Sequence, residues 1–253
     1  MLTLFSERVP ARSVVLLRVV IGLVSIFRGI EEWRVMSHVF RPGIVRFPMF
    51  EFLPVIGLRE AMVLLAVWLL SALAFTVGVQ VRLSGLVLAA TMGATLFIDQ
   101  QLYFSHLYLL TLIVLLVAMA DPENRSETVL YWPVLLLKLQ LSIVYLFAAL
   151  SKLNSQYLSG FMLGANFRKS LTFSPAVLSA FAATSVFVEV FLAFALWSTR
   201  LRKPAVIIGI AMHAAMVCLL APPVIAQLAL FAVECLALYP LFFIAKGEAY
   251  AQR

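Results

Sequence analysis

The sequence has little charge. Of its 253 residues only 12% are Asp, Glu, Lys or Arg, whereas 64% are hydrophobic, and the mean hydropathy is +1.05. A water-soluble domain of this length cannot bury so much apolar surface, because its outer shell must be largely polar. The scarcity of charge therefore excludes a soluble globular protein. It predicts an all-α, polytopic membrane helical bundle that forms a single domain over residues 1–253, with no soluble domain.

Cysteine is also scarce, and the common catalytic motifs are missing. Cys218 and Cys235 both lie in apolar stretches, which predicts small packing residues and neither a disulfide framework nor a metal site. The chain has no P-loop, no dinucleotide-binding glycine pattern, no HExxH motif and no serine nucleophile elbow. Its 19 Lys and Arg residues are spread over short loops without interleaved aromatics. That spread argues against nucleic acid and favours membrane lipids as the partner.

Long apolar stretches predict the transmembrane helices. A helix needs about 20 apolar residues to cross the hydrocarbon core, and fewer where protein shields it. Turn residues or charges separate the stretches, as at Asp121-Pro122 and Pro222-Pro223. The first stretch lacks a cleavage signal, so we expect a retained helix and not a removed signal peptide. About eight transmembrane helices are expected, at residues 13–30, 57–79, 82–99, 104–120, 131–154, 174–198, 204–221 and 223–244.

The loop charges predict an orientation in a bacterial inner membrane. If the N-terminus and the C-terminus are cytoplasmic, most basic loop residues lie inside, and the short loops near Asp99 and Pro222, which have no Lys or Arg, lie outside. The connection over residues 29–60 opposes this pattern, because it is expected outside and contains four arginines. Its mixed charges, prolines and aromatic residues predict an amphipathic segment along the membrane interface.

Lys152 is the polar residue around which the functional prediction is built. It ends the apolar stretch that begins near Trp132. In a helix that turns about 100° per residue, six residues of this stretch fall within about 80° of one another and form a polar stripe, while the opposite side is aliphatic. The stripe contains Lys138, Ser142, Tyr145, Ala149, Lys152 and Gln156. Such a stripe predicts a helix face turned toward protein. Lysines near helix ends also commonly extend their charge into interfacial water, and position alone does not separate these interpretations.

Two histidines are expected near Lys152. If the helix over 131–154 runs outward, Lys152 lies at its outer end, and His106 lies at the outer end of the preceding antiparallel helix. Antiparallel neighbours joined by a short loop usually pack together, which places the two residues at similar depth. His213 lies midway along its own apolar stretch. The three nitrogens are therefore expected to converge on a pocket in the outer half of the bundle.

Glutamates also occur inside the apolar stretches. Glu189 has Ser185 one helical turn before it, and Glu234 lies in the last stretch. Ionisable groups at membrane depth are costly and are candidates for function by default. Each carboxyl can equally be protonated or paired and only hold the bundle together, so both interpretations stay open.

A lysine withdrawn from water can act as a base. In a low-dielectric pocket it loses its preference for the charged form, and the neutral amine becomes reactive. Neutral Lys152 can then remove a proton from a phenol or hydroquinone, or attack a carbonyl. His106 can donate a hydrogen bond to the oxygen that gains charge. The substrate must reach this site from the bilayer, which predicts a lipid-soluble, quinol-like molecule.

Several segments resemble a known family in their order and spacing. The stretch IVYLFAALSKLNSQYLSG, residues 143–160, is similar to the corresponding part of vitamin K-dependent gamma-glutamyl carboxylase and of the bacterial HTTM family. The stretch YFSHLYLL around His106, followed by MADP at 119–122, is similar to the family's histidine-containing segment, and Phe173-Ser174-Pro175 to its Phe-Ser-Pro. Glu189 falls where the carboxylase has an acidic residue. The resemblance covers most of residues 95–220.

The resemblance implies an HTTM-like membrane domain with carboxylase-like chemistry. Lys152 matches the family's catalytic lysine, the base that deprotonates the hydroquinone form of vitamin K, and His106 matches the histidine that stabilises the activated intermediate. The implied co-reactants are reduced vitamin K (menaquinol) or a similar quinol, with O2 and CO2, in an epoxidase-like reaction. Substrate binding is expected from four further residues, namely His213, Tyr145, Glu189 and Asn154.

Two departures restrict what the resemblance implies. The carboxylase has two adjacent lysines where this chain has Ser151-Lys152, and it has a large soluble carboxy-terminal region that is not among these residues. That region holds the protein substrate of the carboxylase. The resemblance therefore implies the fold and the quinol half of the reaction, and it does not imply glutamate carboxylation.

Two further functions stay open. The first is a non-catalytic membrane accessory, a peptide-handling or immunity protein that keeps the same bundle and acts with a peptide or protein partner supplied in trans. The second is an electron-transfer subunit that passes quinol electrons to a partner. Bound quinone favours a quinol-using protein of either kind, whereas an epoxide or hydroxylated product favours the enzyme alone.

Overall fold

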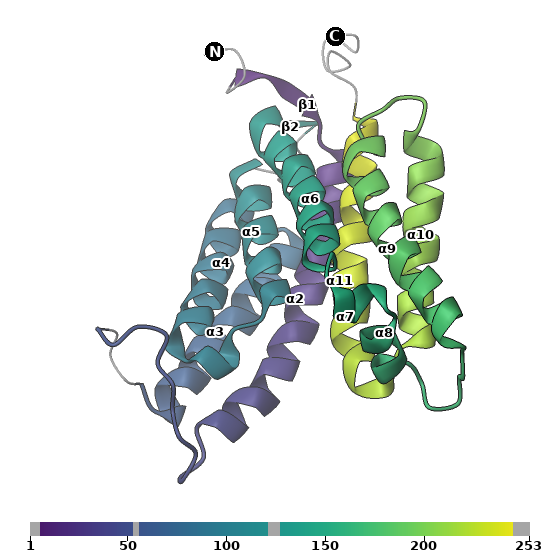
Figure 1. Cartoon of the computed structure of the whole chain (residues 1–253). Coiled ribbons are helices and arrows are strands. Elements are labelled where there is room, and N and C mark those ends of the chain that lie inside the picture. The colour runs from purple at the N-terminus through teal and green to yellow at the C-terminus, as the bar shows by residue number, and fades with distance from the viewer. Residues whose placement is uncertain (1–5, 53–55, 121–126, 245–253) are drawn as a thin grey trace. The chain divides into compact units, whose positions relative to one another are not determined.

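The computed structural model describes residues 6–52, 56–120 and 127–244, and helices make up 77% of it. The prediction of an all-α fold is confirmed (Figure 1). The α-helices are α2 (Arg12–Val39), α3 (Leu58–Val77), α4 (Val81–Ile98), α5 (Ser105–Ala120), α6 (Tyr131–Ser151), α7 (Ser155–Leu158), α8 (Phe161–Asn166), α9 (Pro175–Ala195), α10 (Arg202–Leu219) and α11 (Pro222–Leu238). The 3-10 helices η1 (Gln100–Leu102) and η2 (Tyr239–Phe243) and the strands β1 (Arg8–Pro10) and β2 (Thr128–Leu130) complete the order.

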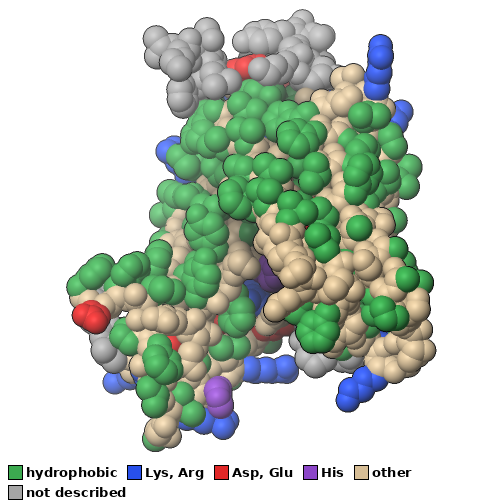
Figure 2. Space-filling view, viewed as in Figure 1, with side chains coloured by type: hydrophobic (Ala, Val, Ile, Leu, Met, Phe, Trp, Pro, Cys, Tyr) green, Lys and Arg blue, Asp and Glu red, His purple; other side chains and the backbone are tan. Residues whose placement is uncertain are grey.

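The long helices make the chain an integral membrane protein. Among the described residues six helices are long and apolar enough to cross a membrane, namely α2, α3, α4, α6, α9 and α10. The apolar helices over Ser105–Ala120 and Gln227–Phe243 are shorter. Hydrophobic side chains spread over the visible helical surfaces, as expected where lipid is the solvent (Figure 2). The number of eight spans stays a prediction.

The chain divides into two compact units. Unit 1 comprises Met1–Leu136 with Ile244–Arg253, and unit 2 comprises Leu137–Phe243. In unit 1 the helices α2 to α5 pack mainly against their neighbours in sequence, and β1 pairs antiparallel with β2. In unit 2, α9 packs against α10 and α10 against α11. The prediction of a single domain stays a prediction.

The first helix is longer than expected. We expected it over residues 13–30, but α2 continues to Val39. Charged residues after an apolar stretch usually indicate a loop, but here they form ion pairs within the helix. The Arg28 guanidinium lies 2.9 Å from Glu31 and 3.7 Å from Glu32, at the i,i+3 and i,i+4 spacing that stabilises a helix. The irregular part of the 29–60 connection therefore begins only at Phe40.

The helix that carries the polar stripe is shorter than expected. It was predicted to run to residue 154, but α6 ends at Ser151. Asn154 has extended backbone angles, and its side chain accepts a hydrogen bond from Tyr157 N at 2.9 Å, which starts α7. Such a capping bond competes with continuation of the preceding helix. The predicted stripe therefore ends with α6, and Gln156 belongs to a different helix.

Candidate functional site

Lys152 and Glu189 form an ion pair within unit 2. Lys152 directly follows α6, and its ammonium Nζ donates a hydrogen bond to Glu189 Oε1 from the middle of α9. The lysine side chain is 22% exposed, whereas that of the glutamate is 5% exposed. The amine is thus directed toward protein and joins the end of α6 to α9.

Two polar side chains border this pair. Tyr157 from α7 places its hydroxyl 2.8 Å from Ser185 Oγ, and Ser185 lies one turn before Glu189 on α9. The Lys152 ammonium lies 5.6 Å from the centroid of the Tyr157 ring, within the range of a cation–π contact. We refer to Lys152, Glu189, Tyr157 and Ser185 as the lysine cluster. Tyr157 was not among the predicted site residues.

A second polar cluster joins α6, α10 and η2. The Tyr145 hydroxyl lies 3.0 Å from His213 Nε2 and 2.7 Å from the Tyr239 hydroxyl, and all three side chains are buried. Buried hydroxyl and imidazole groups need such partners, because unpaired polar groups in an apolar interior are costly. We refer to these three residues as the tyrosine cluster. It brings together the predicted residues Tyr145 and His213.

Gly209 makes room for the tyrosine cluster. It lies one turn before His213 on α10, and a Cβ atom built on it would be only 2.0 Å from the Tyr239 hydroxyl oxygen. No side chain fits there without displacement of the tyrosine. Sequence reasoning missed both Gly209 and Tyr239. The i,i+4 spacing of Gly209 and His213 was the one local signal that could have predicted that Gly209 lies beside the site.

A comparison with protein families decides the identity of this bundle. The HTTM domain matches residues 7–246, which is nearly the whole chain. The chain belongs to the HTTM family. HTTM is the membrane domain of vitamin K-dependent carboxylase-like proteins, so the predicted resemblance is confirmed. No curated protein and no solved structure matches this HTTM protein.

Each cluster of the HTTM protein contains a buried polar atom that is available to bind a ligand. Within the part of the chain that the structure describes, Glu189 Oε2 and His213 Nδ1 are buried and have no hydrogen-bond partner. One is an acceptor, and the other donates or accepts according to the histidine tautomer. A hydroxyl group can donate a hydrogen bond to a carboxylate oxygen such as Glu189 Oε2, and it can donate to or accept from an imidazole nitrogen such as His213 Nδ1. Glu234 is also buried, in α11, and its functional role stays open.

The remaining predicted residues have other surroundings. Asn154 caps α7, and its amide nitrogen donates to Ser151 O at 2.9 Å, so its polar atoms bind the backbone of this turn. His106 lies in the first turn of α5, in unit 1. The Arg28 guanidinium of that unit lies 5.2 Å from the ring centroid of Phe104, two residues before His106. The pairing of His106 with Lys152 stays a prediction.

Proposed function

We propose that this HTTM protein binds a lipid-soluble quinol at the lysine cluster and that Lys152 removes a proton from it. The observation that carries the proposal is the Lys152–Glu189 ion pair inside an apolar helical bundle. Charges are costly at membrane depth and are functional candidates by default. The fold alone accounts for neither group, because apolar residues would join α6 to α9 at lower cost.

The residues around the pair fit a quinol. Such a molecule has two hydroxyl groups on an apolar ring, and the clusters supply an amine, a carboxylate oxygen and a ring nitrogen as hydrogen-bond partners. Within the two clusters, Glu189 Oε2 and His213 Nδ1 are buried and have no hydrogen-bond partner in the part of the chain that the structure describes. The aromatic ring of Tyr157 beside the lysine adds an apolar face.

Proton transfer within the pair would make the lysine a base. When the proton of the Lys152 ammonium moves to the Glu189 carboxylate, both groups become neutral, and the amine can accept a proton from a quinol hydroxyl. The products are the quinolate anion and the re-formed ammonium, which neutralise each other. O2 is the oxidant: one of its oxygen atoms would enter the quinone ring as the epoxide, and the other would leave as water with the two hydroxyl protons of the quinol. The family resemblance adds His106 as the group that stabilises the charged oxygen, and CO2 as a further co-reactant.

A non-catalytic role has an observation in its favour as well. An ion pair between the end of α6 and the middle of α9 can also simply hold these helices in place, as expected of a membrane accessory or immunity protein that keeps the bundle. In that case the charge of residue 152 matters and its ability to lose a proton does not. The two functions therefore differ in what they demand of Lys152.

Identification of the bound lipids tests the proposal. The parent protein and Lys152→Ala are extracted in mild detergent, supplied with menaquinol and O2, and their lipids are analysed by mass spectrometry. We expect stoichiometric quinone in the parent and an epoxide or hydroxylated product that Lys152→Ala does not form. An alanine variant that still forms product, or a parent protein without bound quinone, would overturn the proposal.

A further inference from the structure

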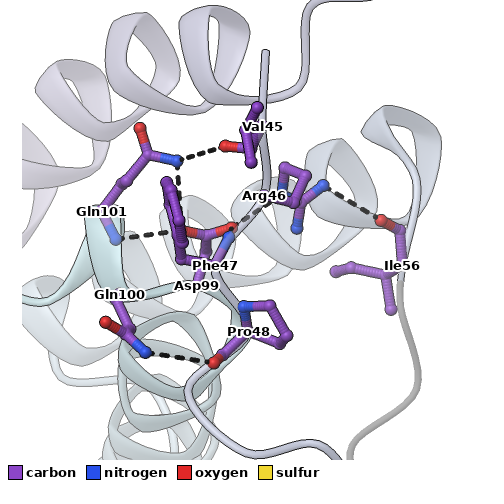
Figure 3. Close-up of polar contacts among 8 residues, drawn as sticks. All are labelled: Val45, Arg46, Phe47, Pro48, Ile56, Asp99, Gln100 and Gln101. Carbon is purple, nitrogen blue, oxygen red and sulfur yellow. Dashed lines mark hydrogen bonds and ion pairs between the residues drawn. The ribbon is translucent and has the colours of Figure 1, made fainter. Parts of the chain in front are cut away.

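A buried carboxylate in unit 1 organises the connection between α2 and α3. Asp99 follows α4, and its side chain is fully buried. Its Oδ2 accepts hydrogen bonds from Arg46 Nε at 2.8 Å and from Phe47 N at 3.0 Å, and its Oδ1 accepts one from Gln101 N at 3.0 Å. Figure 3 shows Asp99 and Arg46 directed toward one another from segments far apart in the sequence.

Backbone contacts extend this arrangement along the connection. The side chain of Gln101 donates to Val45 O at 3.1 Å and that of Gln100 to Pro48 O at 3.4 Å (Figure 3). Gln100 N also donates to Phe47 O at 2.7 Å. We call this set of bonds the Asp99 clamp. It pairs four backbone groups of residues 45–48, a segment without regular secondary structure.

The apolar side chains of the same segment point outward. Phe47, Phe50 and Phe52 are exposed, Phe52 to 81%, and Phe97 of α4 is 47% exposed. The Phe50 ring centroid lies 5.3 Å from that of Phe52 and 5.7 Å from that of Phe97. We call these four residues the phenylalanine patch. These rings are exposed, whereas backbone groups of residues 45–48 are hydrogen-bonded in the Asp99 clamp, an arrangement unlike that of a loop that faces water.

We propose that the phenylalanine patch docks into the phospholipid bilayer, with its rings at the boundary between headgroups and acyl chains. Phe97 belongs to a membrane-spanning helix, so the patch continues a surface that already faces lipid. Arg59, which follows the segment in sequence, is exposed and suits the phosphate groups of lipids. The Asp99 clamp fixes the backbone so that the rings stay outward.

Spin labels can measure the depth of the patch. Cysteine is placed at Phe50 or Phe52 in a protein with Cys218→Ala and Cys235→Ala, labelled with a nitroxide and reconstituted into phosphatidylcholine–phosphatidylglycerol vesicles. Collisions with O2, which concentrates in lipid, are compared with collisions with a water-soluble nickel chelate. We expect O2 to dominate at both positions. The matched label at Arg41, on the same connection but outside the patch, should collide mainly with nickel.

Each other outcome overturns the proposal. Nickel collisions at Phe50 and Phe52 equal to those at Arg41 would place the patch in water. Exclusion of both probes, with dipolar broadening between labels, would show that a second copy of the chain covers it. An independent measurement needs no cysteine substitution. Phe50→Trp adds a tryptophan to the patch, and brominated phosphatidylcholine should quench a larger fraction of the fluorescence of this variant than of the parent protein. An equal quenched fraction would contradict docking.

The clamp has its own control. Asp99→Asn keeps the size of the side chain but replaces one acceptor oxygen by a donor, so it breaks bonds from Arg46 and Phe47 or from Gln101. The label at Phe52 should then become more accessible to nickel than in the parent background. An unchanged depth in the Asp99→Asn background would contradict the role given to the clamp.

Discussion

Lys152 and Glu189 are joined by an ion pair in which the carboxylate is nearly fully buried and the ammonium is partly exposed. The pair connects the residue after α6 to the middle of α9. Loss of one partner from a buried pair leaves the other charge without compensation, and such losses typically cost about 3–5 kcal/mol. Partial exposure of Lys152 reduces this cost, because water can screen the remaining ammonium.

The first prediction concerns the stability that Glu189 contributes. Glu189→Gln should lower the free energy of unfolding by about 1–3 kcal/mol, because it removes the charge that compensates Lys152. The measurement is denaturant unfolding in detergent micelles. Glu51→Gln makes the same chemical change at an exposed position and should be within about 0.5 kcal/mol of the parent. Equal stability of the two variants would contradict the pairing.

The second prediction concerns the space beside Tyr239. Gly209→Ala should destabilise the protein by about 1–3 kcal/mol, because its Cβ would overlap the Tyr239 hydroxyl, only 2.0 Å away. Gly93→Ala in α4 is the matched control. Its Cβ would meet only one atom within 4 Å, Thr111 Cγ2 at 3.9 Å. Alanine is the better helix former, so the control should be neutral or slightly stabilising.

A double variant tests the cause of the Gly209 effect. Tyr239→Phe removes the oxygen that the new methyl group would overlap, although the ring carbon Cζ remains 2.8 Å away. Gly209→Ala should therefore cost less in the Tyr239→Phe background than in the parent. If the free-energy changes of the two substitutions simply add, the Tyr239 hydroxyl is not the group that excludes a larger side chain at residue 209.

The third prediction is a pH dependence that originates at Asp99. Burial alone would raise the pKa of this carboxyl, but hydrogen bonds from Gln101, Arg46 and Phe47 outweigh it and hold the pKa below its ordinary value of 3.8. The ionised form is therefore favoured in the folded state. Its stabilisation is fully present above pH 3.8, the ordinary value, and is lost as the pH falls through the lower folded-state pKa.

Comparison with Asp99→Asn isolates this contribution, because the amide does not titrate. Thermal unfolding of both proteins is followed over a series of pH values. The parent should be more stable than the variant near neutral pH, and the difference should shrink below pH 3.8. A difference that grows on acidification would contradict the lowered pKa.

The sequence predicts helices well where charges mark their ends. The stretches expected at 82–99 and 104–120 correspond to α4 and α5 within one residue at each end, because Arg82 and Asp99 interrupt the apolar pattern. It fails where a charged side chain has a helical partner, as with Arg28 and Glu31 in α2. It also fails where a cap outcompetes an apolar run, as Asn154 does after α6.

The candidate site is only partly visible in the sequence. Lys152 and Glu189 stand out because ionisable groups inside apolar stretches are rare. Tyr157 and Tyr239 do not, because a tyrosine in an apolar stretch has the pattern of an ordinary packing residue. Their hydroxyls acquire partners only when α7 meets α9 and η2 meets α6. Such contacts between distant segments leave no periodicity in the sequence.

The fourth prediction, and the most direct test of the account, is the rate of menaquinol oxidation by Lys152→Arg in lipid nanodiscs. Arginine keeps a positive charge that can pair with Glu189, but it does not lose its proton and cannot act as a base. We predict that Lys152→Arg binds menaquinol, folds as stably as the parent and oxidises the quinol at least about 100-fold more slowly. Oxidation at the parental rate would show that only the charge of residue 152 matters, and it would contradict catalysis by Lys152.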